Sequence, residues 1–220
     1  MQKTKRILEI GYGGRPIIGE LGKFIKEFPG GIEYHGIDLL EINAKGKNGV
    51  SRIFERAHEE AMRMALPDRM KIYNRDARRL NQEEFQGYSF DEIHMHFVHT
   101  YPRIKADDTL KMISEIDRLL SREGVVFISG ERESGMINRI VRGIMHIRME
   151  MPNDFVEREM KKLGYFTWKV TSQNKTDEAA LKRSTDQMLD SVFGIAALKN
   201  AFGNEEWATD IEFMIFKRKE

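Results

Sequence analysis

The chain has 220 residues, of which 40% are hydrophobic and 32% charged, a balance that excludes a disordered chain and suits one α/β domain. It contains no cysteine, so disulfides, thiolate metal sites and a cysteine nucleophile are excluded. No apolar run approaches the ~20 residues of a membrane helix, and the N-terminus is not that of a signal peptide, so we expect a cytoplasmic protein. The formal net charge of +1 is far below that of domains specialised for nucleic acid.

Strand and helix signals alternate along the first 130 residues. Arg6–Ile10 has the apolar character of a buried strand, and a glycine-rich turn follows it. Pro16 suits the first turn of a helix, whose apolar positions recur at helical spacing up to Phe28. The segments expected next are the strand Ile32–Ile37, the helix Ser51–Leu66, the strands Met70–Tyr73 and Phe90–Phe97, the helix Asp107–Leu120 and the strand Val125–Ser129. This alternation predicts a parallel, doubly wound sheet.

The last third of the chain departs from that alternation. Its expected elements are the helices Met136–Met149 and Asp154–Leu163, the strands Gly164–Thr171 and Ile211–Lys217, and an amphipathic helical segment, Glu178–Phe202, between those strands. Two final strands joined by an insertion predict a closing antiparallel hairpin. We therefore expect one domain, 1–220, with a mostly parallel seven-stranded sheet, helices on both faces and a helical insertion at about 175–205. The insertion either caps a site, contacts another subunit or packs on the sheet.

The most informative strand end is the turn after the first strand, Glu9–Pro16. Ligands bind at the carboxyl ends of strands in such sheets, and glycines there let a ligand approach the backbone. The dinucleotide fingerprint requires a glycine or alanine where this chain has Pro16, so the turn departs from that pattern. Glu9 suits a cationic group such as an ammonium or a sulfonium; the alternative is a structural turn with a solvated glutamate.

Two further carboxylates follow strands. Asp38 ends the second strand, where an acid can accept both hydroxyls of a ribose, or can serve as a turn cap. Asp76 follows the third strand, where it can accept from an adenine amino group or cap a short helix.

Together these pieces resemble the class I S-adenosylmethionine-dependent methyltransferases. The resemblance rests on Glu9-x-Gly11-x-Gly13, Asp38, Asp76-Ala77, and the later segments 91–97 and 119–125, and it covers roughly residues 5–130. It departs from the family at Arg15, where a third glycine is frequent. It implies S-adenosylmethionine as cofactor, with the backbone of residues 11–13 beside its methionine portion. The implied cofactor-binding residues are Glu9, Gly11, Tyr12, Gly13, Asp38, Asp76 and Ala77.

The fourth strand end carries three histidines and a tyrosine: His94, His96, His99 and Tyr101. No nearby carboxylate pair completes a ligand set, so we expect no metal. A histidine at this edge can line an acceptor pocket as a base or hydrogen-bonding group, or can be merely packed. The candidate catalytic residues are His96, His99 and Tyr101.

These residues leave several functions open. The first is methyl transfer to an unidentified acceptor, with a small molecule favoured. RNA methylation of the transfer-RNA type requires a basic face, which the net charge does not indicate. A nicotinamide-dependent oxidoreductase is disfavoured by Pro16 and the final strand pair. A non-catalytic cofactor-binding module remains open because of the histidine-rich strand end.

Overall fold

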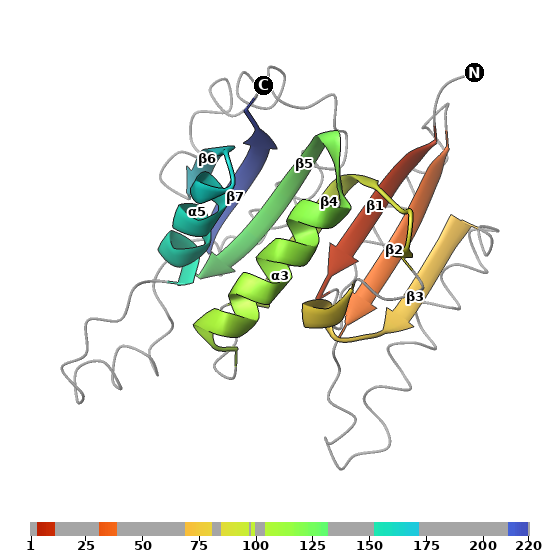
Figure 1. Ribbon diagram of the computed structural model, residues 1–220, viewed down its shortest axis with the longest axis horizontal. Helices are drawn as coiled ribbons and strands as arrows, with labels where there is room; N and C mark the ends of the chain where they lie inside the picture. Colours follow the sequence, from red (N-terminus) through yellow and green to blue (C-terminus); the bar gives the residue numbers. More distant parts are fainter. Residues whose placement is uncertain are drawn as a thin grey trace, which may run out of the picture.

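The computed structural model describes residues 4–11, 31–38, 69–80, 85–96, 98–99, 104–131, 152–171 and 211–219. In these ranges seven strands form one sheet, in the order β3-β2-β1-β4-β5-β7-β6 (Figure 1). The strands are β1 (Lys5–Ile10), β2 (Ile32–Asp38), β3 (Met70–Asn74), β4 (Phe90–His96), β5 (Leu120–Glu131), β6 (Tyr165–Thr171) and β7 (Ile211–Arg218). The order reverses at β1, which lies between β2 and β4, so the sheet is doubly wound as predicted.

The strand directions match the prediction of a mostly parallel sheet with an antiparallel end. The strands β1 to β5 are mutually parallel, whereas β7 runs antiparallel to both β5 and β6. The order therefore differs from the dinucleotide-binding order 3-2-1-4-5-6, because β7 lies between β5 and β6. This difference disfavours a nicotinamide-dependent enzyme.

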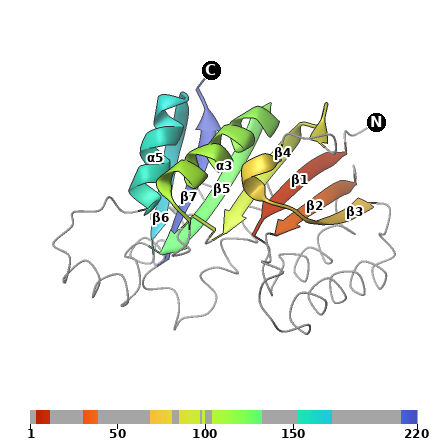
Figure 2. The same ribbon diagram turned by 60° about the horizontal axis from the view of Figure 1, so that its bottom comes forward.

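One face of the sheet is covered by α3 (Ala106–Leu119), α5 (Pro152–Lys162) and the short helix η2 (Ala77–Arg79) (Figure 2). The side of α3 that faces the sheet consists of buried residues at helical spacing: Thr109, Met112, Ile113, Ile116 and Leu119. They pack with sheet residues such as Leu8, Ile93 and Val126, a continuous apolar core whose burial drives this packing.

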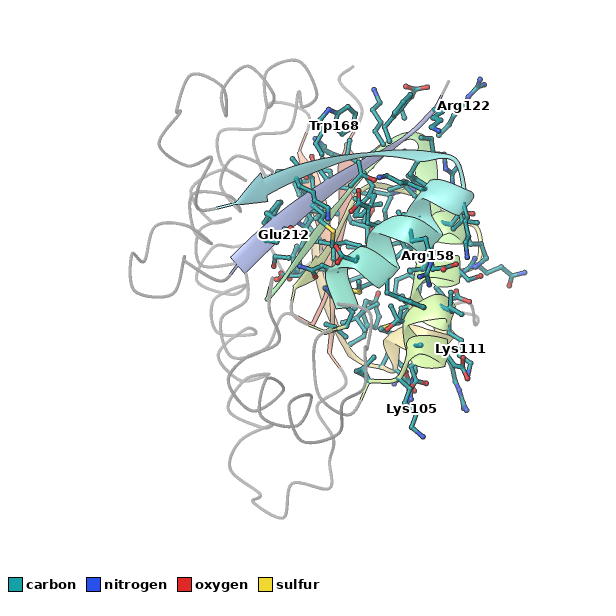
Figure 3. All side chains as sticks on the ribbon, turned by 90° about the vertical axis from the view of Figure 1, so that its left-hand side faces the viewer. Lys105, Lys111, Arg122, Arg158, Trp168 and Glu212 are labelled. Carbon is teal, nitrogen blue, oxygen red and sulfur yellow. The ribbon has the colours of Figure 1, made fainter. Side chains whose placement is uncertain are left out.

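The outer surface of these helices is charged. Lys105 and Lys111 of the α3 region and Arg158 of α5 are exposed on the side away from the sheet (Figure 3). Acidic residues occupy the first turn of α3 and Arg118 its last turn, which complements the helix dipole.

Helices on the second face were also expected. The other predicted helical segments, 17–28, 51–66, 136–149 and 178–202, lie outside the described residues, as does the insertion at 175–205. No helix in the described ranges is long and apolar enough to cross a membrane.

The boundary between α3 and β5 differs from the prediction. Gly124 was expected to separate the helix from a strand beginning at Val125, but β5 begins at Leu120, directly after α3. Leu120 pairs with Phe90 of β4, and the register shifts before Glu92. A Cβ on Gly124 would lie 2.7 Å from the Leu120 side chain, so this glycine permits close packing inside the strand.

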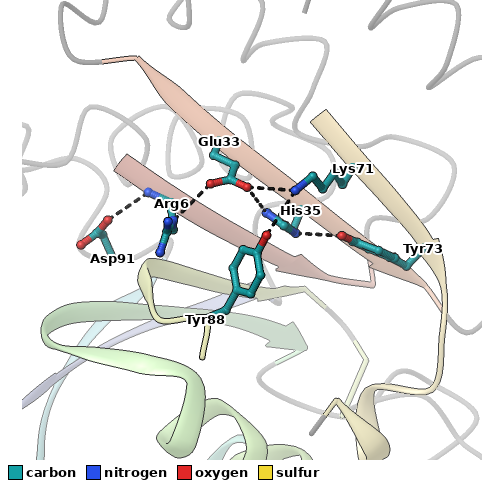
Figure 4. A network of polar contacts seen from close by, with 7 residues as sticks. All are labelled: Arg6, Glu33, His35, Lys71, Tyr73, Tyr88 and Asp91. Atoms are coloured by element: carbon teal, nitrogen blue, oxygen red, sulfur yellow. Dashed lines mark hydrogen bonds and ion pairs between the residues drawn. The ribbon is translucent and has the colours of Figure 1, made fainter. Parts of the chain in front are cut away.

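A polar and aromatic network ties β1, β2 and β3 together near their amino ends (Figure 4). At its centre His35 is fully buried, with Nε2 3.0 Å from Glu33 Oε1 and Nδ1 3.2 Å from the Tyr73 hydroxyl. Lys71 donates to Glu33 and to the Tyr88 hydroxyl, each over 3.2 Å. Both ring nitrogens of His35 are thus engaged within the sheet, and we interpret this network as structural.

Candidate cofactor and acceptor site

The carboxyl ends of β1 and β2 lie side by side. Gly11, directly after β1, has φ 77°, a conformation that favours glycine. Its N–H donates to the Ile37 carbonyl over 2.7 Å, which holds the start of the turn against β2. Because Ile10 is in register with Ile37, Gly11 and Asp38 are brought together at the point where the strand order reverses. The side chain of Asp38 and the residues Tyr12 and Gly13 lie outside what the structure describes.

Glu9 points to the face opposite α3 and is only 2% exposed. Its Oε2 accepts a hydrogen bond from the Tyr34 hydroxyl. Tyr34 is in register with Ile7, two positions before Glu9 on the same side of the pleat, so its ring extends along β1 to the carboxylate. The alternative of a solvated glutamate is therefore wrong, because Glu9 is a buried acid close to the Gly11 turn.

Asp76 caps the short helix that follows β3. Its Oδ1 accepts from the Arg78 backbone N–H over 2.9 Å, and its two oxygens accept from the Arg78 guanidinium over 2.6 to 3.0 Å. Burial opposes ionisation, but these hydrogen bonds outweigh it and hold the pKa of Asp76 below its usual value. Arg78 also pairs with Asp108 of α3 over 3.0 Å. Asp76 thus serves as a cap whose two oxygens are both engaged by Arg78; Ala77 beside it is buried.

The residues after β4 bring a second buried pair to the same edge of the sheet. His99 is 3% exposed and Asn153, in the first turn of α5, is 1% exposed. Nε2 of His99 lies 2.7 Å from Oδ1 of Asn153. Burial lowers the pKa of His99 to about 4, although the Asn153 hydrogen bond acts in the opposite direction, so the imidazole is neutral at physiological pH.

His99 was predicted from the sequence, but Asn153 was not. The two residues are 54 positions apart, and an asparagine at the start of a helix is ordinarily interpreted as a cap. The side chain of His96, and Tyr101, lie outside the described residues.

His94 lies on the face opposite α3, inside the sheet. Its ring stacks on Phe127 with centroids 4.6 Å apart, and its Nε2 lies 3.2 Å from Glu92 Oε2. Glu92 also pairs with Lys5, and these partners lower the pKa of Glu92 despite its burial. His94 is therefore a packed residue. Among the described residues no three His, Asp or Glu side chains gather as a metal site.

Comparison with solved structures identifies the fold. The sequence matches no protein-family model and no curated protein. A proposed sarcosine dimethylglycine methyltransferase from Galdieria sulphuraria is 16% identical, with a TM-score of 0.58 over 99% of this chain and 80% of that one. Phosphoethanolamine N-methyltransferase 2 from Haemonchus contortus, solved with S-adenosyl-L-methionine, is 18% identical, with a TM-score of 0.56 over 100% of this chain and 50% of that one. The chain has the class I S-adenosylmethionine-dependent methyltransferase fold.

The same fold also occurs in a similar protein of another substrate class. An rRNA methylase from Streptococcus thermophilus is 8% identical, with a TM-score of 0.51 over 100% of this chain and 90% of that one. The present chain spans only half of the Haemonchus contortus protein. The class I methyltransferase fold therefore does not by itself select an acceptor.

Proposed function

We propose that the protein binds S-adenosylmethionine at the carboxyl ends of β1 and β2 and transfers its methyl group to a small-molecule acceptor. The observation that carries this proposal is the positive φ of Gly11, 77°, beside Asp38 at the point where the strand order reverses. A glycine in this conformation leaves the backbone open to a ligand, and an acid at the end of β2 suits ribose hydroxyls.

The remaining residues fit the same cofactor. Glu9 is a buried carboxylate two positions before the turn, oriented by Tyr34, and we assign it to the side of the amino-acid portion. Asp76 and Ala77 follow β3, on the adenine side. Tyr12 and Gly13 complete the proposed turn.

The protein contributes to methyl transfer mainly by positioning the acceptor and the cofactor. The sulfonium group of the cofactor supplies an already activated methyl group. The residues of this chain have to hold the acceptor in line with it and exclude water, and such alignment accounts for a large part of the rate. A base is needed only if the acceptor must lose a proton. We propose His99 as a residue of the acceptor side, together with His96 and Tyr101 from the same segment.

A small acceptor is supported by the overall charge and by the named substrates of two similar proteins. The net charge of +1 does not favour an RNA-binding surface, and two structural neighbours are a proposed sarcosine dimethylglycine methyltransferase and a phosphoethanolamine N-methyltransferase. RNA methylation predicts instead a steep loss of RNA affinity with rising salt.

Calorimetric titration with S-adenosylhomocysteine, with NAD as a control, tests the cofactor. Micromolar binding of S-adenosylhomocysteine without NAD binding supports the proposal; binding of NAD alone, or of neither, overturns it. Asp38→Ala should weaken binding about tenfold or more, because charge-assisted hydrogen bonds contribute about 1.5 to 3 kcal/mol. The matched control is Glu123→Ala, which removes an exposed carboxylate in β5. Unchanged affinity in Asp38→Ala would remove Asp38 from the ribose role.

A further inference from the structure

The strand β6 forms one edge of the sheet, and within the described ranges its only neighbour in the sheet is β7. The N–H of Lys219 donates to the Gly164 carbonyl over 2.9 Å, in the same register as the rest of the β6–β7 pair. Hydrogen-bonded and non-hydrogen-bonded pairs alternate along an antiparallel ladder, so the even-numbered residues of β6 bond to β7. The odd-numbered residues, Thr167 and Lys169 among them, therefore direct their backbone N–H and carbonyl groups away from the sheet.

This edge lacks the usual protection of an edge strand in the part of the chain that the structure describes. Such strands are ordinarily blocked by a proline, a bulge or an outward charge. β6 has no proline, and its register with β7 is continuous. Its one charged side chain, Lys169, is held on the α5 side, with Nζ 2.5 Å from Glu157 and 3.3 Å from Asp154. On the other face Phe166 is 51% exposed, with its ring centroid 6.2 Å from that of Trp168.

A groove beside α5 adds a charge pattern to the same side of the molecule. Its volume is about 460 Å³, and it is lined by one stripe of the helix: Asp154, Glu157, Arg158, Lys161 and Lys162. The acids lie at the amino end of this stripe and the bases at its carboxyl end. Asp154 and Glu157 also pair with Lys169 of β6, so the groove borders the β6 edge. Figure 3 views the molecule from this side, with β6 and α5 next to each other.

We propose that β6 and α5 form the interface of a twofold dimer with a second copy of this chain. A twofold rotation pairs the two β6 strands antiparallel, so the outward backbone groups of each copy bond to those of the other. The exposed rings of Phe166 and Trp168 then lie against the second copy.

The charges of α5 select a second copy as the partner. The same rotation sets the two α5 helices antiparallel, so Asp154 of each copy faces Lys161 and Lys162 of the other. These three side chains are more than half exposed, and the ion pairs that they form within one copy are therefore weak. An unrelated strand would satisfy the backbone edge alone, whereas a second copy satisfies the backbone edge and the charges together.

The proposed interface is separate from the proposed cofactor site. Gly11 and Asp38 lie at the ends of β1 and β2, and the strands β4, β5 and β7 lie between these and β6. The inference therefore does not rest on the proposed function. Cooperative unfolding in urea serves as the measure of correct folding for each variant below.

Sedimentation equilibrium of the full chain tests the dimer, and we expect twice the chain mass for the native protein. Asp154→Lys places like charges opposite each other, as does the double variant Lys161→Glu with Lys162→Glu, so each should dimerise about tenfold or more weakly. Mixed in equal amounts, the two variants should pair, because opposite charges then face each other at both ends of the helices. The control Lys111→Glu reverses an exposed charge on α3 and should leave the dimer intact.

A second pair of variants tests the backbone ladder. Thr167→Pro removes an outward N–H and should weaken dimerisation about tenfold or more, whereas Thr167→Val keeps the N–H and should not. The inference is overturned if the native protein has the mass of one chain at high concentration, or if mixing the two charge variants does not restore pairing. Dimerisation of Thr167→Pro as strong as that of the native protein would also contradict it.

Discussion

Acidification should destabilise the protein through His99. Burial lowers the pKa of this imidazole in the folded state to about 4, from an ordinary value of 6.5. The unfolded chain therefore takes up a proton below about pH 6.5, whereas the folded chain does so only below about pH 4. The contribution to stability is complete above this window and is lost as the pH falls through it.

The size of the effect follows from the same two values. The full loss across this pKa difference is about 3 kcal/mol, and most of it is reached by pH 4.5. The partner of His99, Asn153, is uncharged and does not stabilise an imidazolium as a carboxylate would.

Urea denaturation at about pH 7.5 and about pH 4.5 measures this loss. The free energy of unfolding of the native protein should fall by about 2 to 3 kcal/mol more than that of His99→Gln, since the other titrating groups are common to both. Asn153→Asp is the matched control: a carboxylate beside Nε2 favours the charged imidazole and should reduce the loss. Parallel behaviour of the native protein and His99→Gln would refute a buried, neutral His99.

Three further substitutions test the packing around the site. Tyr34→Phe should lower the free energy of unfolding by about 1 to 3 kcal/mol in urea denaturation, because buried Glu9 loses a donor; full stability would show that this bond contributes nothing. Gly11→Ala should lower the free energy of unfolding by about 1 to 2 kcal/mol, because alanine is strained at a φ of 77°. It should also weaken S-adenosylhomocysteine binding in calorimetry, and normal values of both would contradict our placement of the turn. Gly124→Ala should lower the free energy of unfolding by about 1 to 3 kcal/mol, because the added Cβ would meet Leu120. It should leave S-adenosylhomocysteine affinity intact; a loss of affinity would connect this glycine to the site.

The sheet was largely predictable because its strands carry local signals. Each of β1, β2 and β4 is a short segment in which apolar residues are interspersed with polar ones, and the final alternating strand indicated the antiparallel end. The beginning of β5 was not predictable in the same way. Leu120 belongs to the apolar pattern of α3 and also pairs with Phe90, and a contact 30 positions distant is not visible in local periodicity.

The cofactor side and the acceptor side of the proposed site also differ in how far local sequence signals reveal their residues. Gly11, Asp38 and Asp76 each lie at or within two residues of the end of a strand, so the rule that ligands bind at strand ends is enough to select them. The environment of Glu9, two positions before Gly11, was nevertheless decided only by a tertiary contact, because it is buried against Tyr34 rather than solvated. Asp76 holds Arg78 through a local contact, two positions along the chain.

The acceptor side depends on residues that the chain brings together from far apart. His99 alone could be a base, a ligand or a packed side chain, and its sequence neighbours do not choose among these roles. Asn153 limits them, because it engages Nε2 and because burial without a charged partner keeps the ring neutral.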